Sequence, residues 1–118
     1  MTIAQSIAAG QTRTYATLDG PGCIKRIWIA LSRGPNSGRE MPPESPGPRR
    51  LQNRKMTIRI YFDDATTPNV EAPIGDFFGM MHGIDQYNLN TPFLAAKDHA
   101  GYESYFEMPF ATSARIEI

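Results

Sequence analysis

The fold is decided by the stretch Met56-Thr57-Ile58-Arg59-Ile60-Tyr61-Phe62, which shows the cleanest alternation of side-chain type in the chain. Successive side chains of a β-strand point to opposite faces, so the apolar members of this stretch share one face. These members are Met56, Ile58, Ile60 and Phe62, and Arg59 and Tyr61 turn to the other face. The pattern predicts a strand, and turn residues at 63–69 predict that residues 70–74 return antiparallel to it as a hairpin.

The rest of the chain also favours strands over helices. Ten glycines and ten prolines among 118 residues interrupt the sequence too often for long helices. Further strands are predicted at residues 12–18, 23–31, 102–106 and 114–118. The sequence therefore predicts an all-β fold, an antiparallel β-sandwich that forms one domain over residues 1–118.

The predicted strand at residues 23–31 is apolar on both of its faces. One face carries Ile27, Ile29 and Leu31, and the other carries Ile24, Trp28 and Ala30. A strand of this kind belongs at the centre of a sheet that is covered on each side. Its position therefore favours burial of Trp28 in the core.

Two segments limit the predicted sheet. Residues 32–55 form a stretch that is too long for an ordinary hairpin and too rich in proline and glycine for a helix. We therefore expect a loop. The predicted strand at residues 114–118 has an apolar inward face, and no further strand follows it in the sequence. We therefore expect the sandwich to be incomplete at its C-terminal edge, as in a fragment of a longer protein.

The charge and composition of the chain do not indicate a nucleic-acid or membrane partner. Twelve Lys and Arg residues balance twelve Asp and Glu residues, and the basic cluster at residues 49–55 is typical of a solvated segment. The first ten residues lack the basic start of a signal peptide and are too few to span a bilayer. We expect a soluble protein with no nucleic-acid or membrane partner, and the single Cys23 leaves the redox compartment open.

A glycine-bracketed segment after the hairpin is the predicted functional site. Gly75, Gly79 and Gly83 permit backbone angles and close approaches that a side chain would block, so the turn itself positions the groups between them. These groups are Asp76, Phe77, Phe78 and His82.

The histidines do not indicate a metal site. His82 and His99, with Asp85 and Asp98 nearby, match no zinc spacing, and calcium loops set their carboxylates more closely. We expect no metal and no cofactor, and interpret His82 as a hydrogen-bonding residue beside Asp76.

Several blocks in a fixed order resemble one family. They are Gly20-Pro21-Gly22-Cys23-Ile24-Lys25-Arg26-Ile27-Trp28, Arg59-Ile60-Tyr61-Phe62-Asp63, Pro73-Ile74-Gly75-Asp76-Phe77-Phe78-Gly79, Met108-Pro109-Phe110 and Ser113-Ala114-Arg115-Ile116. The chain resembles the DUF2961 family, which is glycoside hydrolase family 172 (GH172). At Glu103 and Glu107 it departs from the asparagine or uncharged residues that are more usual in the family, and we expect an altered subunit or sugar contact there.

The resemblance implies a fold and an activity. Family members contain two jelly-roll β-sandwiches, form trimers or hexamers and act on furanosides such as α-D-fructofuranosides and D-arabinofuranosides. The likeness covers the N-terminal jelly roll, and the catalytic glutamate pair of the family lies further along than Ile118. The resemblance thus implies a fragment that is not active alone, with its catalytic residues unknown.

The predicted site residues allow two interpretations. Asp76 can shape its turn by accepting backbone N–H bonds or can contact the sugar. Phe77, Phe78 and Trp28 can cover the apolar face of a sugar, although packing in a core is the commoner role of such rings. The first hypothesis is a jelly roll that lines a furanoside pocket and a subunit interface, and the alternative is a non-catalytic assembly or carbohydrate-binding module.

Overall fold

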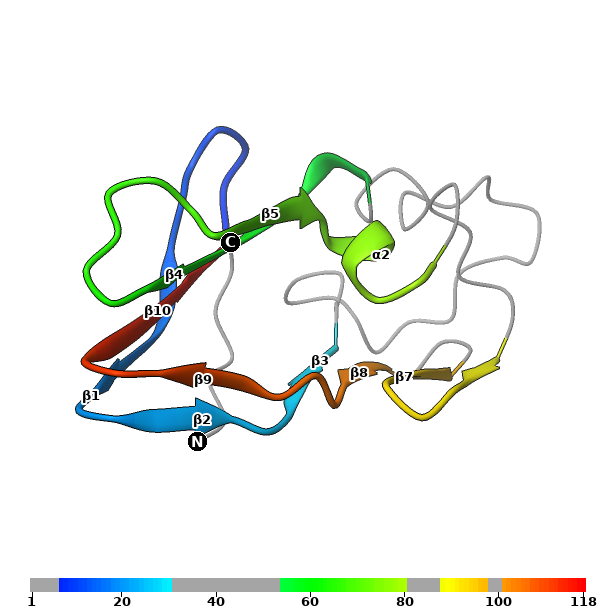
Figure 1. Cartoon of the computed structure of the whole chain (residues 1–118). Helices are drawn as coiled ribbons and strands as arrows, with labels where there is room; N and C mark the ends of the chain where they lie inside the picture. Colours follow the sequence, from blue (N-terminus) through cyan, green and yellow to red (C-terminus); the bar gives the residue numbers. More distant parts are fainter. Residues whose placement is uncertain (1–6, 31–53, 81–87, 98–100) are drawn as a thin grey trace.

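The structure is a computed structural model, and it describes residues 7–30, 54–80, 88–97 and 101–118, in which nearly all regular structure is β-strand (Figure 1). One sheet, here called the β4 sheet, has four antiparallel strands. Their order is β1 (Thr14–Asp19), β10 (Ser113–Glu117), β4 (Thr57–Phe62) and β5 (Val70–Pro73).

A second layer faces the β4 sheet. It contains the β8 sheet, in the order β3 (Ile27–Ile29), β8 (Gly101–Ser104), β7 (Leu94–Lys97) and β6 (Leu89–Asn90). A short ribbon of β2 (Gly22–Ile24) and β9 (Met108–Phe110) lies in the same layer, and the one-turn helix α2 (Ile74–Phe77) follows β5 at one end of the gap between the layers (Figure 1). The predicted all-β sandwich is confirmed.

The alternation in β4 works as predicted. Ile58 and Ile60 have exposed fractions of 1% and 0%, because their face of the strand meets the core. On the opposite face Arg59 donates from Nε to Glu71 of β5 at 2.7 Å. The antiparallel β4–β5 hairpin is confirmed by its register, in which Arg59 stands opposite Glu71.

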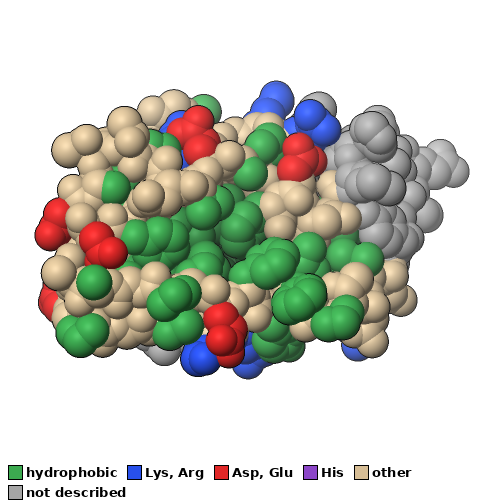
Figure 2. Space-filling view, in the orientation of Figure 1, with side chains coloured by type: hydrophobic (Ala, Val, Ile, Leu, Met, Phe, Trp, Pro, Cys, Tyr) green, Lys and Arg blue, Asp and Glu red, His purple; other side chains and the backbone are tan. Residues whose placement is uncertain are grey.

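The core lies between the two layers. Its buried members come from both sheets and from the segment around α2: Ile58, Ile60, Ile74, Phe78, Met80, Ala96, Tyr102 and Ile118. Figure 2 shows hydrophobic side chains along the middle of the face that is turned to the viewer, between the two layers, with charged side chains around them.

The prediction of one continuous strand at residues 23–31 is wrong. The chain forms β2, bends at Lys25 and Arg26, and continues as β3, so each half pairs with a different strand. In a straight strand one of two adjacent cations would point inward, whereas the bend leaves both exposed. Each is ion-paired at 2.6 Å, Lys25 with Glu107 and Arg26 with Glu103.

The prediction that residues 114–118 form an edge is also wrong. Strand β10 lies inside the β4 sheet, hydrogen-bonded to β1 on one side and to β4 on the other. Ala114 and Ile118 are buried there. The alternation of side chains correctly predicted which face of this strand points inward. Its pairing with β1 joins distant parts of the sequence, so no local pattern indicates it.

Within the described residues, three strands and the helix α2 were not predicted. Strands β6, β7 and β9 are two to four residues long, which is too short for a visible alternation. Helix α2 stands where a glycine-framed turn was expected, and Pro73 precedes its first residue. The expected loop at residues 32–55 lies outside the described residues except for Arg54 and Lys55, which are helical, so the loop prediction is wrong at these two positions. No helix in the described ranges is long and apolar enough to cross a membrane.

Asp63 fastens the turn between β9 and β10. Its Oδ1 accepts hydrogen bonds from the backbone N–H groups of Thr112 and Ala111, each at 2.8 Å, and from Ser113 N–H at 3.4 Å. These donors, led by the Thr112 N–H, hold the pKa of Asp63 below its ordinary value of 3.8. The residue itself is left-handed, with φ 54°, a conformation that Asp and Asn tolerate better than most residues.

Asp63→Asn is therefore expected to lower the melting temperature at neutral pH, because the amide fits the same backbone but lacks the charge. A lowered pKa stabilises the fold above the unfolded value, and this stabilisation disappears as pH falls below about 4 through the folded pKa. The difference between the two proteins should thus shrink in acid when melting is followed by circular dichroism. Asp64→Asn is the control, with φ 59° and one hydrogen bond from Ser113; equal losses in both variants would contradict the role of Asp63.

Candidate functional site

The predicted site segment forms α2 and the residues after it. Gly75 lies in the helix and is buried, whereas Gly79 has φ +77° and closes the helix by donating its N–H to Asp76 O at 3.1 Å. The left-handed conformation explains glycine at position 79. His82 and Gly83 lie outside the described residues.

The two phenylalanines of this segment have different environments. Phe78 has no exposed surface, and its ring centroid is 5.8 Å from that of Tyr102 on the inner face of β8. Phe77 is half-buried and meets Phe78 edge to face, with centroids 4.9 Å apart. Phe78 thus packs in the core, and Phe77 is the ring of the pair that reaches the surface.

Asp76 remains at the surface. Its Oδ1 lies 3.7 Å from Nη1 of Arg54, and both side chains are exposed. An exposed pair at this distance contributes little to stability. Asp76 is therefore accessible to a ligand or a neighbouring molecule.

Trp28 is not in the core, so the prediction of its burial is wrong. Its neighbours Ile27 and Ile29 pack against the core, and Trp28 points to the outer face of the β8 sheet with 53% of its surface exposed. The bend at Lys25 and Arg26 shifts the alternation by one residue. Because of this shift, residues 23–31 look apolar on both faces in the sequence, although in the structure only one face of the segment packs against the core.

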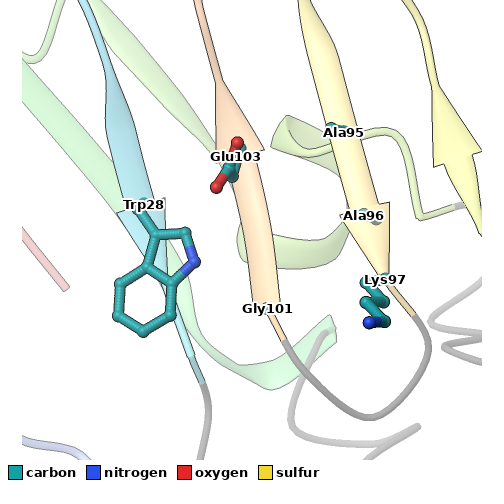
Figure 3. Close-up of a pocket in the computed structure, with 6 residues that line it drawn as sticks. All are labelled: Trp28, Ala95, Ala96, Lys97, Gly101 and Glu103. Atoms are coloured by element: carbon teal, nitrogen blue, oxygen red, sulfur yellow. The ribbon is translucent and has the colours of Figure 1, made fainter.

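Trp28 borders a hollow of about 320 Å³ on this outer face (Figure 3). The lining residues come from β3, β7 and β8: Trp28, Ala95, Ala96, Lys97, Gly101 and Glu103. Trp28, Glu103 and Ala95 stand opposite one another across the three strands, and Gly101 stands opposite Lys97. Strand register thus brings together residues that are far apart in the sequence.

The absence of a side chain at Gly101 allows the Trp28 indole to lie close to β8. A Cβ atom added at Gly101 would lie 3.0 Å from Nε1 of Trp28 and 3.0 Å from the backbone oxygen of Ile29. Only a residue without a side chain lets the indole lie over β8 in this way. Figure 3 shows Trp28 and Lys97 on the two sides of Gly101, with Glu103 further along the same strand.

Glu103 is held by two donors. Arg26 donates from Nη2 to Oε1 at 2.6 Å, and the Tyr105 hydroxyl donates to Oε2. The bond from Tyr105, followed by that from Arg26, lowers the pKa of Glu103, while the same carboxylate raises the pKa of Tyr105. The carboxylate is therefore ionised at neutral pH and fixed in orientation.

The structure does not bring all predicted site residues together. Phe78 packs on the inner face of the β8 sheet, whereas Trp28 lies on its outer face. Asp76 and Phe77 therefore form one surface and Trp28 belongs to another. Glu103, Lys97 and Gly101, which complete the hollow, were not predicted as site residues, and only the unusual glutamate at position 103 gave a signal in the sequence.

The hollow carries groups that can bind a polar ligand. It offers an aromatic face, a carboxylate that accepts hydrogen bonds and an ammonium group that donates them. Glycoside hydrolysis uses two carboxyl groups, and Glu103 is the one acid that lines the hollow among the described residues. In the same ranges no group of three His, Cys, Asp or Glu side chains gathers as metal ligands would.

The family model described as GH172 domain-like matches residues 1–118. No curated protein matches the chain.

Gly101→Ala is expected to displace the indole, because the new methyl group would come within 3.0 Å of it. Trp28 is the one tryptophan in the sequence, so its fluorescence should shift to the red and become easier to quench with acrylamide. Gly10→Ala is the control, since an added Cβ there meets nothing within 4 Å. It should leave the emission unchanged despite its strained φ of +77°. An unaltered spectrum in Gly101→Ala would contradict the contact.

Proposed function

This chain belongs to the GH172 glycoside hydrolase family, and we propose that it forms a sugar-binding wall in an enzyme that acts on furanosides. The sugars are of the α-D-fructofuranoside or D-arabinofuranoside type. The resemblance implies that catalysis comes from a glutamate pair outside residues 1–118, which supplies the two carboxyl groups that hydrolysis needs across the scissile bond. The protein works as a homo-oligomer, a trimer or hexamer, in which this sandwich also contributes to the subunit interface.

Exposure of Trp28 is the observation that carries this proposal. An indole with 53% of its surface exposed, held over a glycine beside a fixed carboxylate, is costly for a structural residue and useful for a binding residue. Sugars have apolar C–H faces that cover such a ring, and their hydroxyls reach Glu103 and Lys97 at the rim. The volume of about 320 Å³ is at the low end of the ~300–1,000 Å³ range of small-molecule sites, which suits one sugar ring.

Asp76, Phe77 and His82 form the second part of the proposal. Asp76 and Phe77 lie on the other side of the β8 sheet from Trp28, so one sugar ring cannot touch both groups within one chain. We assign them to a sugar contact that is completed at the subunit interface. Phe78 supports them from the core.

A specific observation favours the assembly module as the second candidate. Phe93 and Phe106 stack with centroids 5.5 Å apart and an angle of 10°, while 56% and 40% of their surfaces are exposed. The Tyr105 N–H donates to Phe93 O at 2.8 Å and joins the two loops. A rigid apolar pair of this kind suits a contact with another protein surface.

Trp28→Ala and Phe93→Ala distinguish these two functions. For a sugar wall, Trp28→Ala should weaken binding of a methyl furanoside roughly tenfold, the upper end of what a stacked ring contributes, without changing the oligomer. Phe93→Ala serves as the matched control for loss of an exposed ring. Calorimetry measures the affinity and light scattering the assembly. Unchanged affinity in Trp28→Ala, with assembly lost in Phe93→Ala, would favour the assembly module.

Asp76→Ala tests the second surface in the complete protein. The sugar contact predicts a loss of hydrolysis with the oligomer and melting temperature intact, because among the described residues the Asp76 side chain makes only a loose exposed pair with Arg54. Glu71→Ala is the control, since it removes an exposed carboxylate from an ion pair with Arg59 on the outer face of the β4 sheet. If hydrolysis and assembly both survive in Asp76→Ala, the residue has neither role.

A further inference from the structure

We infer that Glu103 determines the specificity of the Trp28 hollow by accepting hydrogen bonds from two neighbouring ring hydroxyls of the bound sugar. The inference rests on the proposed function, because it presupposes that a sugar ring lies against Trp28. It adds the group that distinguishes one ring from another. Stacking on an indole discriminates little between sugars, since every sugar ring has an apolar face.

The position of Glu103 makes this contact possible. Strand register places it directly between Trp28 of β3 and Ala95 of β7. The Cβ atoms of residues at such opposed positions are about 4.5–5.5 Å apart, so a sugar ring on the indole brings its hydroxyls next to the carboxylate. Ala95 is too small to cover the carboxylate from the other side. The Glu103 side chain keeps 22% of its surface exposed.

Glu103 also retains acceptor capacity. A carboxylate has about four lone-pair positions, two on each oxygen. Among the described residues Arg26 occupies one position on Oε1, and Tyr105 one on Oε2. One position thus remains on each oxygen. This arrangement fits two hydroxyls on adjacent ring carbons.

The two protein donors prepare the carboxylate for this role. They fix its plane before a ligand arrives, which reduces the entropy lost on binding. They also keep it ionised, and hydrogen bonds to an ionised acceptor are about twice as strong as neutral ones. Lys97, opposite Gly101 at the other end of the hollow, supplies a donor to a third oxygen of the ring.

The test measures, by calorimetry, the affinity of the complete protein for methyl α-D-arabinofuranoside and for its 2-deoxy and 3-deoxy analogues. In the wild type the loss of either hydroxyl should weaken binding roughly tenfold or more, as expected for a bond to a charged group. In Glu103→Gln the parent sugar should bind roughly tenfold more weakly, and the three ligands should become nearly equal. Such non-additivity identifies a direct partner.

Glu107→Gln is the matched control. Glu107 pairs with Lys25 at 2.6 Å, the same distance as the Arg26–Glu103 pair, but it does not line the hollow. It should leave the affinities and their order unchanged. If melting curves show that Glu103→Gln does not fold, Glu103→Asp replaces it in the test. This variant keeps the charge but moves the carboxylate oxygens back by one methylene. It should also no longer discriminate between the parent sugar and its deoxy analogues.

Two failures are distinguishable. Glu103 variants that still discriminate between the parent and deoxy sugars overturn the role of Glu103 and leave the sugar site intact. A wild-type protein that binds none of the three sugars overturns the proposed function, and the role of Glu103 with it.

Discussion

Packing of the Phe78 ring against Tyr102 is the interaction on which the arrangement of the two layers depends. Phe78 follows the hairpin of the β4 sheet, and Tyr102 belongs to the β8 sheet, so their contact joins elements from opposite layers. Burial of one such ring contributes about 1.5–3 kcal/mol. Because side chains alternate along a strand, turning Tyr102 inward also turns Gly101 and Glu103 outward. The same contact that closes the core therefore presents the floor and the acid of the hollow.

The bend at Lys25 and Arg26 is the second constraint. It keeps two adjacent cations in solvent and shifts the alternation, so that Ile24 on one side of the bend and Ile27 on the other both face inward. Trp28 consequently faces outward. The ion pair between Arg26 and Glu103 then crosses from the bend to β8 and connects the position of the indole with that of the carboxylate.

Sequence analysis could predict the parts of the fold that local patterns encode. The alternation in residues 56–62 gave β4 and its buried face, and the turn residues after it gave the hairpin. The family followed from ordered motifs and is confirmed by the match over residues 1–118. The interior position of β10 and the exposure of Trp28 were missed because both depend on pairing between distant segments. The hollow could not be predicted for the same reason, since register alone sets Glu103 beside Trp28.

The central claim is that the outer face of the β8 sheet binds a furanoside through Trp28. The indole N–H resonance of Trp28 in a proton–nitrogen NMR spectrum tests it most directly, because Trp28 lines the hollow and its peak is identified by its loss in Trp28→Phe. Titration of the complete protein with methyl α-D-arabinofuranoside should move this peak along a saturable curve, in step with the backbone amides of Gly101 and Glu103. A peak that stays in place while amides elsewhere respond, around Asp76 for example, would contradict the account.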